Sequence, residues 1–388
     1  MLLIKNAHIL TMEDAEYDNG YIITEGTKIK EVGHMADLLM PEDTFDDVYD
    51  AKGNYALPGF IDAHCHVGLW AEGAGSEGAD GNESSDPVTP QLRAIDSVDP
   101  FDEAFSDALM AGVTTVVTGP GSANIIGGQF AALKTGGRWV DEMILKAPVA
   151  MKAALGENPK RNYGSKGTAP KTRMANAAIL REALFKAKEY VRKQDAYLAG
   201  EKKSRPEPDF KMEAMADVIR KKLPLKVHAH RADDICTAIR IAEEFDICLT
   251  LEHCTEGHLI APLLAEKKIP VMLGPALDCR TKPELKNKSY EVYCLMEEAG
   301  VPFAIITDHN VMPISELYLL ASLVHKNGVS AMATLRGITI NAAKNTGIDD
   351  RVGSLASGKD ADIVIVSGEL FSLNAKVEAV FLNGNQVK

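Results

Sequence analysis

Short apolar segments that end in metal-binding types of side chain recur through the middle of this chain. His64 and His66 close the apolar run that begins at Leu57, and Asp308 closes the last such run. Helical periodicity lies between the runs, as in Asp233–Glu244. Alternating strands and helices predict an α/β fold with a parallel sheet, closed into a (β/α)8 (TIM) barrel. The predicted strands are Gly112–Thr118, one within Ile125–Thr135, Val149–Ala154, Leu225–His230, Ile247–His253, Ile269–Leu273 and Phe303–Asp308, and further helices are predicted at Phe210–Lys222, Ser315–Lys326 and Ser330–Thr346.

The two ends of the chain differ from the middle, because they contain short β-like runs separated by turn residues. Neither end is long enough to bury a core alone, so we expect the two ends to pair. The prediction is a small β-sandwich-like domain from residues 1–56 and 355–388, with a catalytic barrel from residues 57–354. Strands are predicted at Leu3–Leu10, Tyr21–Thr24, Lys28–Val32, Ala361–Val366 and Val377–Leu382, with a turn at 18–20.

Composition and charge narrow the class of protein. The 388 residues carry a formal charge of -13, which disfavours nucleic acid and anionic membranes as partners. The six cysteines form no CxxC pair, as in reduced proteins of the cytoplasm. We find no signal peptide and no apolar run long enough to span a bilayer. The sequence therefore predicts a cytoplasmic protein that acts on a small molecule.

The segment Leu57–His66 combines an apolar run with two histidines spaced two residues apart. Strand side chains alternate between faces, so His64 and His66 point the same way and Cys65 points the other way. Two imidazoles that converge at a strand end can chelate a divalent cation. The motif alone also fits a packed strand whose two histidines bind no metal. Motifs elsewhere in the chain are needed to distinguish the two interpretations.

Ligand-type side chains recur at the later predicted strands. Lys152 lies within the fourth strand, His228 and His230 end the fifth, and His253 and Asp308 end the sixth and eighth. The carboxyl ends of barrel strands converge on one face. We therefore expect these side chains to share one site with the two histidines of the first strand.

These motifs together resemble the amidohydrolase superfamily, in the branch that includes imidazolonepropionase and prolidase-like amidohydrolases. The resemblance covers nearly the whole chain. Each piece is short, but the combination is specific. The matching segments are PGFIDAHCH, GVTTV, VHAH, LEHC, ITDH and the closing NAAKNTGIDDRVGSLASGKDADIVIV.

The resemblance implies a role for each matching position. His64, His66, His228, His253 and Asp308 correspond to the metal ligands of the family. Asp308 is also implied to act as the general base and acid. The resemblance implies one or two divalent metal ions per chain. The ligand types favour zinc, and manganese, iron or cobalt suit the same residues.

Lys152 corresponds to the lysine that is carboxylated in two-metal members of the family. An ammonium group has no acceptor lone pair, so this role requires a CO2-derived carbamate. Glu157 is the alternative bridging residue, since some relatives use a glutamate; we rank it second because it falls outside the predicted strand.

The mechanism that the resemblance implies is hydrolysis by a metal-bound hydroxide. A divalent cation lowers the pKa of water from near 16 to about 7 and polarises the scissile carbonyl. Asp308 would move the proton to the leaving nitrogen, and His253 or His230 would stabilise the oxyanion. The expected reaction is hydrolysis of an amide or cyclic amide C–N bond.

The substrate is less well defined by the sequence. His230 stands where deaminases and imidazolonepropionases of the superfamily usually carry a glutamate, which disfavours both reactions. Arg161, Tyr163 and Arg231 lie in or beside segments expected on the active face, including the irregular segment Glu157–Pro170. Because arginine matches a carboxylate, we predict that these three residues and His230 contact an N-acyl amino acid or a dipeptide.

Other interpretations stay open at this point. One is an imidazolonepropionase-type reaction, and another is hydrolysis of a lactone or phosphotriester on the same metal site. A third is a non-catalytic relative, which is disfavoured because every ligand position is filled. A homo-oligomer is compatible with the family.

Overall fold

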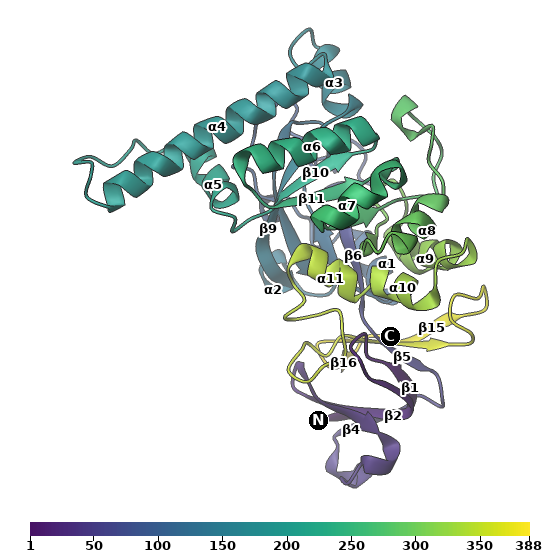
Figure 1. Ribbon diagram of the computed structural model, residues 1–388. Helices are drawn as coiled ribbons and strands as arrows, with labels where there is room; N and C mark the ends of the chain where they lie inside the picture. Colours follow the sequence, from purple (N-terminus) through teal and green to yellow (C-terminus); the bar gives the residue numbers. More distant parts are fainter.

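The computed structural model describes residues 1–388 and contains two eight-stranded sheets, one above the other in Figure 1. The upper sheet is the predicted barrel, with its strands in sequence order. The segment that follows the last strand meets the end of the first through backbone hydrogen bonds: the Asp308 N–H donates to the His64 carbonyl at 3.2 Å, and the His66 N–H to the His309 carbonyl at 2.7 Å. The barrel strands are β6 (Phe60–Cys65), β7 (Val113–Thr118), β8 (Ile126–Lys134), β9 (Ile144–Ala154), β10 (Leu225–Ala229), β11 (Leu249–His253), β12 (Val271–Leu273) and β13 (Phe303–Ile305).

The barrel departs from the expected all-parallel pattern at one strand. β8 lies within the range predicted for the third strand, but it runs antiparallel to both β7 and β9. Only seven residues connect β7 to β8, and a parallel crossover needs a dozen or more. The short connection therefore forces the chain to turn back, and β9 restores the common direction before β10.

Helices cover the outside of the barrel, and several of them differ from the prediction. The single helix expected over Ser330–Thr346 is broken into α10 and α11 after Gly337. A Cβ atom at Gly337 would lie 3.1 Å from the Ile305 side chain, so glycine lets α10 approach β13 and also ends it. The helices are α1 (Glu103–Met110), α2 (Val140–Met143), α3 (Glu157–Gly164), α4 (Arg173–Leu198), α5 (Phe210–Ile219), α6 (Ala232–Phe245), α7 (Ala261–Lys267), α8 (Glu291–Glu298), α9 (Leu317–Lys326), α10 (Ala331–Gly337) and α11 (Ile340–Thr346).

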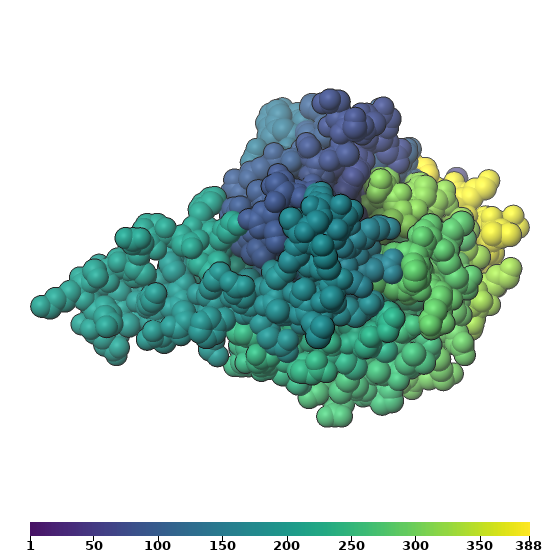
Figure 2. All heavy atoms as spheres, turned by 90° about the horizontal axis from the view of Figure 1, so that it is seen from above, coloured from purple at the N-terminus to yellow at the C-terminus, as the bar shows by residue number.

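Two helices occupy segments where the sequence had suggested none. α3 begins at Glu157 inside the segment predicted to be irregular. Glu157 and Pro159 both suit a first helical turn, where a carboxylate favours the helix dipole and proline loses no hydrogen bond. The 26-residue α4 then extends away from the barrel, as the teal arm in Figure 2 shows. No helix of the structure is both long and apolar enough to cross a membrane.

The lower sheet joins the two ends of the chain, as predicted, and both termini lie on it in Figure 1. It is one hydrogen-bonded sheet with apolar clusters on both faces, around Ile22 and Ile363 on one face and around Tyr21 and Ile23 on the other. Residues 18–20, predicted to form a turn, lie inside β2: Gly20 pairs with both β1 and β3, and residues 18 and 19 fall at a register shift against β1. The strands are β1 (Leu2–Leu10), β2 (Glu16–Glu25), β3 (Lys28–His34), β4 (Asp47–Asp50), β5 (Tyr55–Pro58), β14 (Ile363–Ser367), β15 (Lys376–Leu382) and β16 (Asn385–Gln386).

A group of paired charges joins this sheet to the barrel, and we call it the junction cluster. Lys134 on β8 contacts the carboxylates of Asp360 and Asp362, which precede β14. Asp360 also accepts two hydrogen bonds from Arg351, at 2.8 and 2.9 Å, and lies 2.5 Å from the Lys28 ammonium. Each buried carboxylate of the junction cluster thus faces at least one cation. The cluster consists of Lys28, Lys134, Arg351, Asp360 and Asp362.

Candidate metal centre and active site

A cavity of about 430 Å³ opens at the end of the barrel where the parallel strands terminate. Only three of its 23 lining residues are hydrophobic, so it is suited to a polar ligand or a cation. The predicted ligand-type residues all line it, and we call these seven residues the catalytic cluster: His64, His66, Lys152, His228, His230, His253 and Asp308.

The first histidine pair points into the cavity from the end of β6. His66 donates a hydrogen bond from Nδ1 to the Gly119 carbonyl at 2.7 Å, and its Nε2 lies 3.2 Å from Asp308 Oδ1. The Nε2 atom of His64 lies 3.4 Å from the same carboxylate oxygen. Two imidazole nitrogens and the Asp308 Oδ1 atom, three candidate ligand atoms, therefore lie together. Burial lowers the pKa of His64 to about 3, which keeps its imidazole neutral.

A second group forms where β10 and β11 end. Ligand atoms of His228, His230 and His253 lie within 4.8 Å of one another, and His253 also belongs to a group with His64 and Asp308. His253 can reach both groups because its φ of 68° interrupts the alternation of β11. His230, which the sequence predicts as a substrate contact, thus lies in the same group as the predicted metal ligands His228 and His253.

Lys152 enters the cavity from β9 and is fully buried. Its Nζ atom lies 3.3 Å from His64 Nε2, and burial lowers its pKa to about 7. Glu157, the alternative bridging residue, is not on the cavity wall; it starts α3, and its backbone N–H donates to Glu284. The geometry therefore favours Lys152 over Glu157.

Two charged residues beneath the histidines were missed by the sequence analysis. Glu252 Oε2 lies 3.0 Å from His64 Nδ1 and 2.9 Å from the Lys226 ammonium, and all three residues are buried. The Lys226 and His64 contacts hold the pKa of Glu252 below its usual range although burial alone would raise it. Lys226 stands two residues before His228, so strand alternation was a signal that could have placed it on the same inward face.

A further buried carboxylate comes from the segment after β12, which carries no motif. Glu284 Oε1 lies 3.7 Å from Nε2 of both His228 and His230, and 3.0 Å from the Lys282 ammonium. Lys282 also donates to the Asn158 side chain on α3. Long-range packing alone brings these residues to the site, so no local pattern could have identified them.

Of the three predicted substrate contacts other than His230, only one lines the cavity. Arg161 on α3 lines the cavity. Tyr163 does not, because its side chain is buried and its hydroxyl donates to Asn124 at 2.6 Å. Arg231 is also off the cavity wall and pairs through two nitrogens with Asp233. The prediction for Tyr163 and Arg231 therefore does not match their positions.

The donor set fits a divalent cation. His66 and His253 each donate Nδ1–H to a backbone carbonyl, at 2.7 and 2.8 Å, which leaves the Nε2 lone pair free. Burial lowers the pKa of His228 and His230 well below the usual value, so these imidazoles are neutral. Neutral imidazoles and a carboxylate are the ligands that zinc and related cations prefer.

Comparison with known proteins agrees with this geometry. The family model "Amidohydrolase family" matches residues 55–387. The chain belongs to the amidohydrolase family. Members of this family typically bind divalent metals, as the histidine-rich groups here suggest.

Three amidohydrolase-family proteins illustrate how this chain compares with known members. The crystal structure of an amidohydrolase from Thermotoga maritima MSB8 superposes with a TM-score of 0.94 and is 41% identical over the whole of both chains. Amidohydrolase tasK from Hapsidospora irregularis is 28% identical over 420 residues, covering 98% of this chain and 42% of that protein. An imidazolonepropionase from Paracidovorax citrulli is 33% identical over 149 residues, or 37% of this chain and 34% of that protein. The chain thus spans less than half of these two curated relatives.

Proposed function

We propose that this protein hydrolyses a C–N bond, in an amide or cyclic amide, of a small molecule that carries a carboxylate. N-acyl amino acids and dipeptides are the substrate classes to test first. The observation that carries the proposal is the convergence of five histidines, Lys152 and Asp308 on one polar cavity. Family membership supports the same chemistry.

The cation would be held by two ligand groups that share His253. His64, His253 and Asp308 form one group, with His66 beside Asp308, and His228, His230 and His253 form the other. When bound, zinc or a related divalent cation lowers the pKa of a water molecule to about 7 and polarises a carbonyl. Lys152 Nζ lies 3.3 Å from His64 Nε2, and this residue would hold the cation only as a CO2-derived carbamate.

The protein's own groups then move protons and orient the substrate. The Asp308 carboxylate takes a proton from the attacking water and delivers it to the leaving nitrogen, so that the amine departs neutral. Whichever of His230 and His253 does not hold the cation would stabilise the oxyanion. Arg161 binds the substrate carboxylate, since a guanidinium offers two parallel donors; Lys282 and Lys288 add positive charge to the same cavity.

A substrate panel with two arginine variants tests this proposal. The metal-loaded protein is assayed against N-acyl amino acids, dipeptides, cyclic amides, lactones and phosphotriesters. For the best amide, Arg161→Ala is expected to raise KM about tenfold, the equivalent of one lost charge-assisted hydrogen bond, with metal content unchanged. Arg231→Ala removes the same charge outside the cavity and is expected to change KM less than twofold.

Two outcomes would contradict the proposal. Faster turnover of a lactone or phosphotriester than of every amide would assign a different bond. Equal KM values for the two arginine variants would remove Arg161 from substrate recognition.

A further inference from the structure

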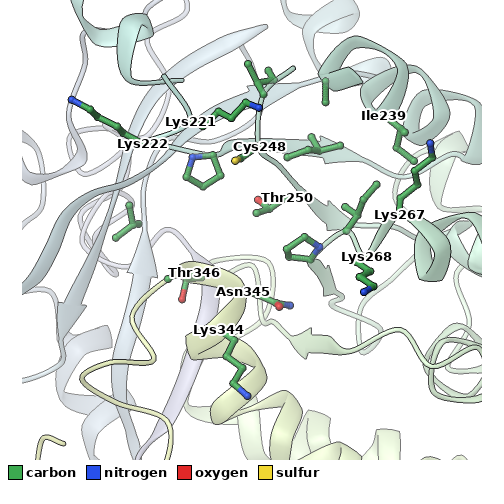
Figure 3. Close-up of a pocket in the computed structure, with 18 of the residues that line it drawn as sticks. Lys221, Lys222, Ile239, Cys248, Thr250, Lys267, Lys268, Lys344, Asn345 and Thr346 are labelled. Carbon is green, nitrogen blue, oxygen red and sulfur yellow. The ribbon is translucent and has the colours of Figure 1, made fainter. Parts of the chain in front are cut away.

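A second and larger cavity, of about 620 Å³, lies at the opposite end of the barrel. Pro224, Leu249 and Pro270 line it where β10, β11 and β12 begin, and α11 closes one side. It shares no lining residue with the catalytic cavity. We call it the basic pocket, and Figure 3 shows lysines on three sides of it.

Positive charge is concentrated in the basic pocket although the chain as a whole is acidic. Six lysines and only two carboxylates line it, an excess of four positive charges in a protein of formal charge -13. No arginine is among its lining residues. The charged residues are Lys146, Lys221, Lys222, Lys267, Lys268, Lys344, Glu243 and Asp246.

Helix dipoles at this end of the barrel do not cancel the excess. The C-termini of α6, α7 and α11 contribute lining residues, and each helix end carries roughly half a negative charge. Three such ends oppose four positive charges with less than half of their magnitude. The positive charge of the lysines therefore exceeds what would balance the helix ends, and the basic pocket keeps a positive potential.

Part of this charge has no partner within the protein. Lys221 pairs with Asp246 at 2.7 Å, and Lys267 pairs with Glu243 at 2.5 Å. Lys268 and Lys344 form no ion pair or side-chain hydrogen bond, although both line the basic pocket. Their ammonium groups are exposed on flexible stems, so they can turn toward a ligand with only a change of rotamer.

The remaining lining indicates the kind of anion. Seven of the 21 lining residues are hydrophobic, among them the side chains of Ile239 and Ile247, which suits a ligand with a carbon skeleton. Lysine binds phosphate as a compact point charge, and a phosphate monoester carries close to two negative charges where a carboxylate carries one. An excess of four positive charges therefore suits phosphate groups.

We propose that the basic pocket binds a small organic molecule with two phosphate groups, at a site remote from the catalytic cavity. Two unpaired lysines on separate elements, α11 and the end of α7, match two separated charges. The apolar wall contacts the carbon skeleton between them. This proposal is independent of the bond that the catalytic cavity hydrolyses.

Two exposed cysteines provide reporters for the two ends of the barrel. Cys248 lines the basic pocket, and Cys279 adjoins the Asp278 side of the catalytic cavity. The full-length, metal-loaded protein is titrated with fructose 1,6-bisphosphate as the probe. Alkylation rates of both thiols are then followed by peptide mass spectrometry. The bisphosphate is expected to slow alkylation of Cys248 about fivefold or more and to leave the rate at Cys279 unchanged, because it would cover the basic pocket and not the catalytic cavity.

Two double variants that remove the same charge test whether Lys268 and Lys344 bind the bisphosphate. Lys268→Gln/Lys344→Gln is expected to weaken bisphosphate binding about tenfold or more in isothermal titration, since two direct ion pairs are lost. Lys202→Gln/Lys203→Gln removes the same charge from exposed positions beyond α4 and is expected to change the affinity less than twofold. Glucose 6-phosphate, with one phosphate, is expected to bind about tenfold more weakly, and all binding is expected to weaken with salt.

Several results would overturn the proposal. Protection of Cys279 without Cys248 would place the bisphosphate in the catalytic cavity. Equal affinity in the two double variants would show that the unpaired lysines do not bind it. Tighter binding of propane-1,2,3-tricarboxylate than of the bisphosphate would assign a carboxylate ligand, and no binding of either probe would remove the site. Unfolding midpoints of both variants establish that a lost affinity is not a lost fold.

Discussion

The catalytic cluster and the junction cluster both place charged or ionisable side chains in the interior, yet they are built differently. In the junction cluster each carboxylate faces a cation: Lys134 contacts Asp360 and Asp362, and Arg351 binds Asp360 through two nitrogens. In the catalytic cluster, neutral imidazoles point their free nitrogens at a shared space. One cluster is complete within the protein, and the other has unused ligand capacity.

This difference shows how a buried polar group can be assigned a role. Burial alone does not distinguish the two clusters, because Lys134, Asp360 and Asp362 are buried as the histidines are. The balance of donors and acceptors does distinguish them, since a protein leaves few buried polar atoms without partners unless a ligand supplies them. The comparison predicts that mutations in the catalytic cluster affect activity and that mutations in the junction cluster affect stability.

The largest effect is expected for Asp308→Asn in the catalytic cluster. The amide has no charge to hold a cation and cannot accept the proton, so kcat/KM is expected to fall about 10³-fold. The unfolding midpoint of the metal-free protein is expected to stay within about 2 °C, because the hydrogen bonds that close the barrel here involve backbone atoms. Steady-state kinetics and thermal unfolding provide the two measurements, and a large loss of stability with full activity would reverse the assignment.

The opposite behaviour is expected for Lys134→Met in the junction cluster. Asp362 would stay buried without its cation, which is expected to lower the free energy of unfolding by about 3 kcal/mol. The kcat of the folded protein is expected to be unchanged, because Lys134 does not line the catalytic cavity.

Lys28→Met is the matched control, since its side chain is 41% exposed and Asp360 keeps two other cations. It is expected to cost less than about 1 kcal/mol in urea unfolding. Equal losses in the two variants would show that burial of the pair has no energetic consequence.

The smallest effect is expected in the acid dependence of the junction cluster. Burial would raise the pKa of Asp360, but Arg351 and Lys134 outweigh it and hold the pKa at about 2. A folded pKa below the unfolded one gives stability that is present above about pH 4 and lost as the pH falls toward about 2. The stability advantage of the native protein over Asp360→Asn is therefore expected to narrow by about 1 kcal/mol between pH 7 and pH 3. Urea unfolding of both proteins at several pH values measures it, and a difference that grows on acidification would contradict the assignment.

Much of the barrel could be predicted because its signals are local. Strand alternation placed His64 and His66 on one face, and both line the cavity. Family membership and the barrel are confirmed by the matched family and the Thermotoga structure. The errors also have local causes: a turn signal at 18–20 was overridden by sheet pairing, and one helical pattern hid the break after Gly337.

The sequence by itself determined the candidate cation ligands and the strand ends that carry them, because residues two apart in a strand point to the same face. Only the tertiary structure decided which neighbours meet them. The exclusion of Tyr163 from the cavity and the arrival of Glu284 both depend on contacts between distant segments. Such contacts follow from packing of the whole chain, and no local pattern of residues records them.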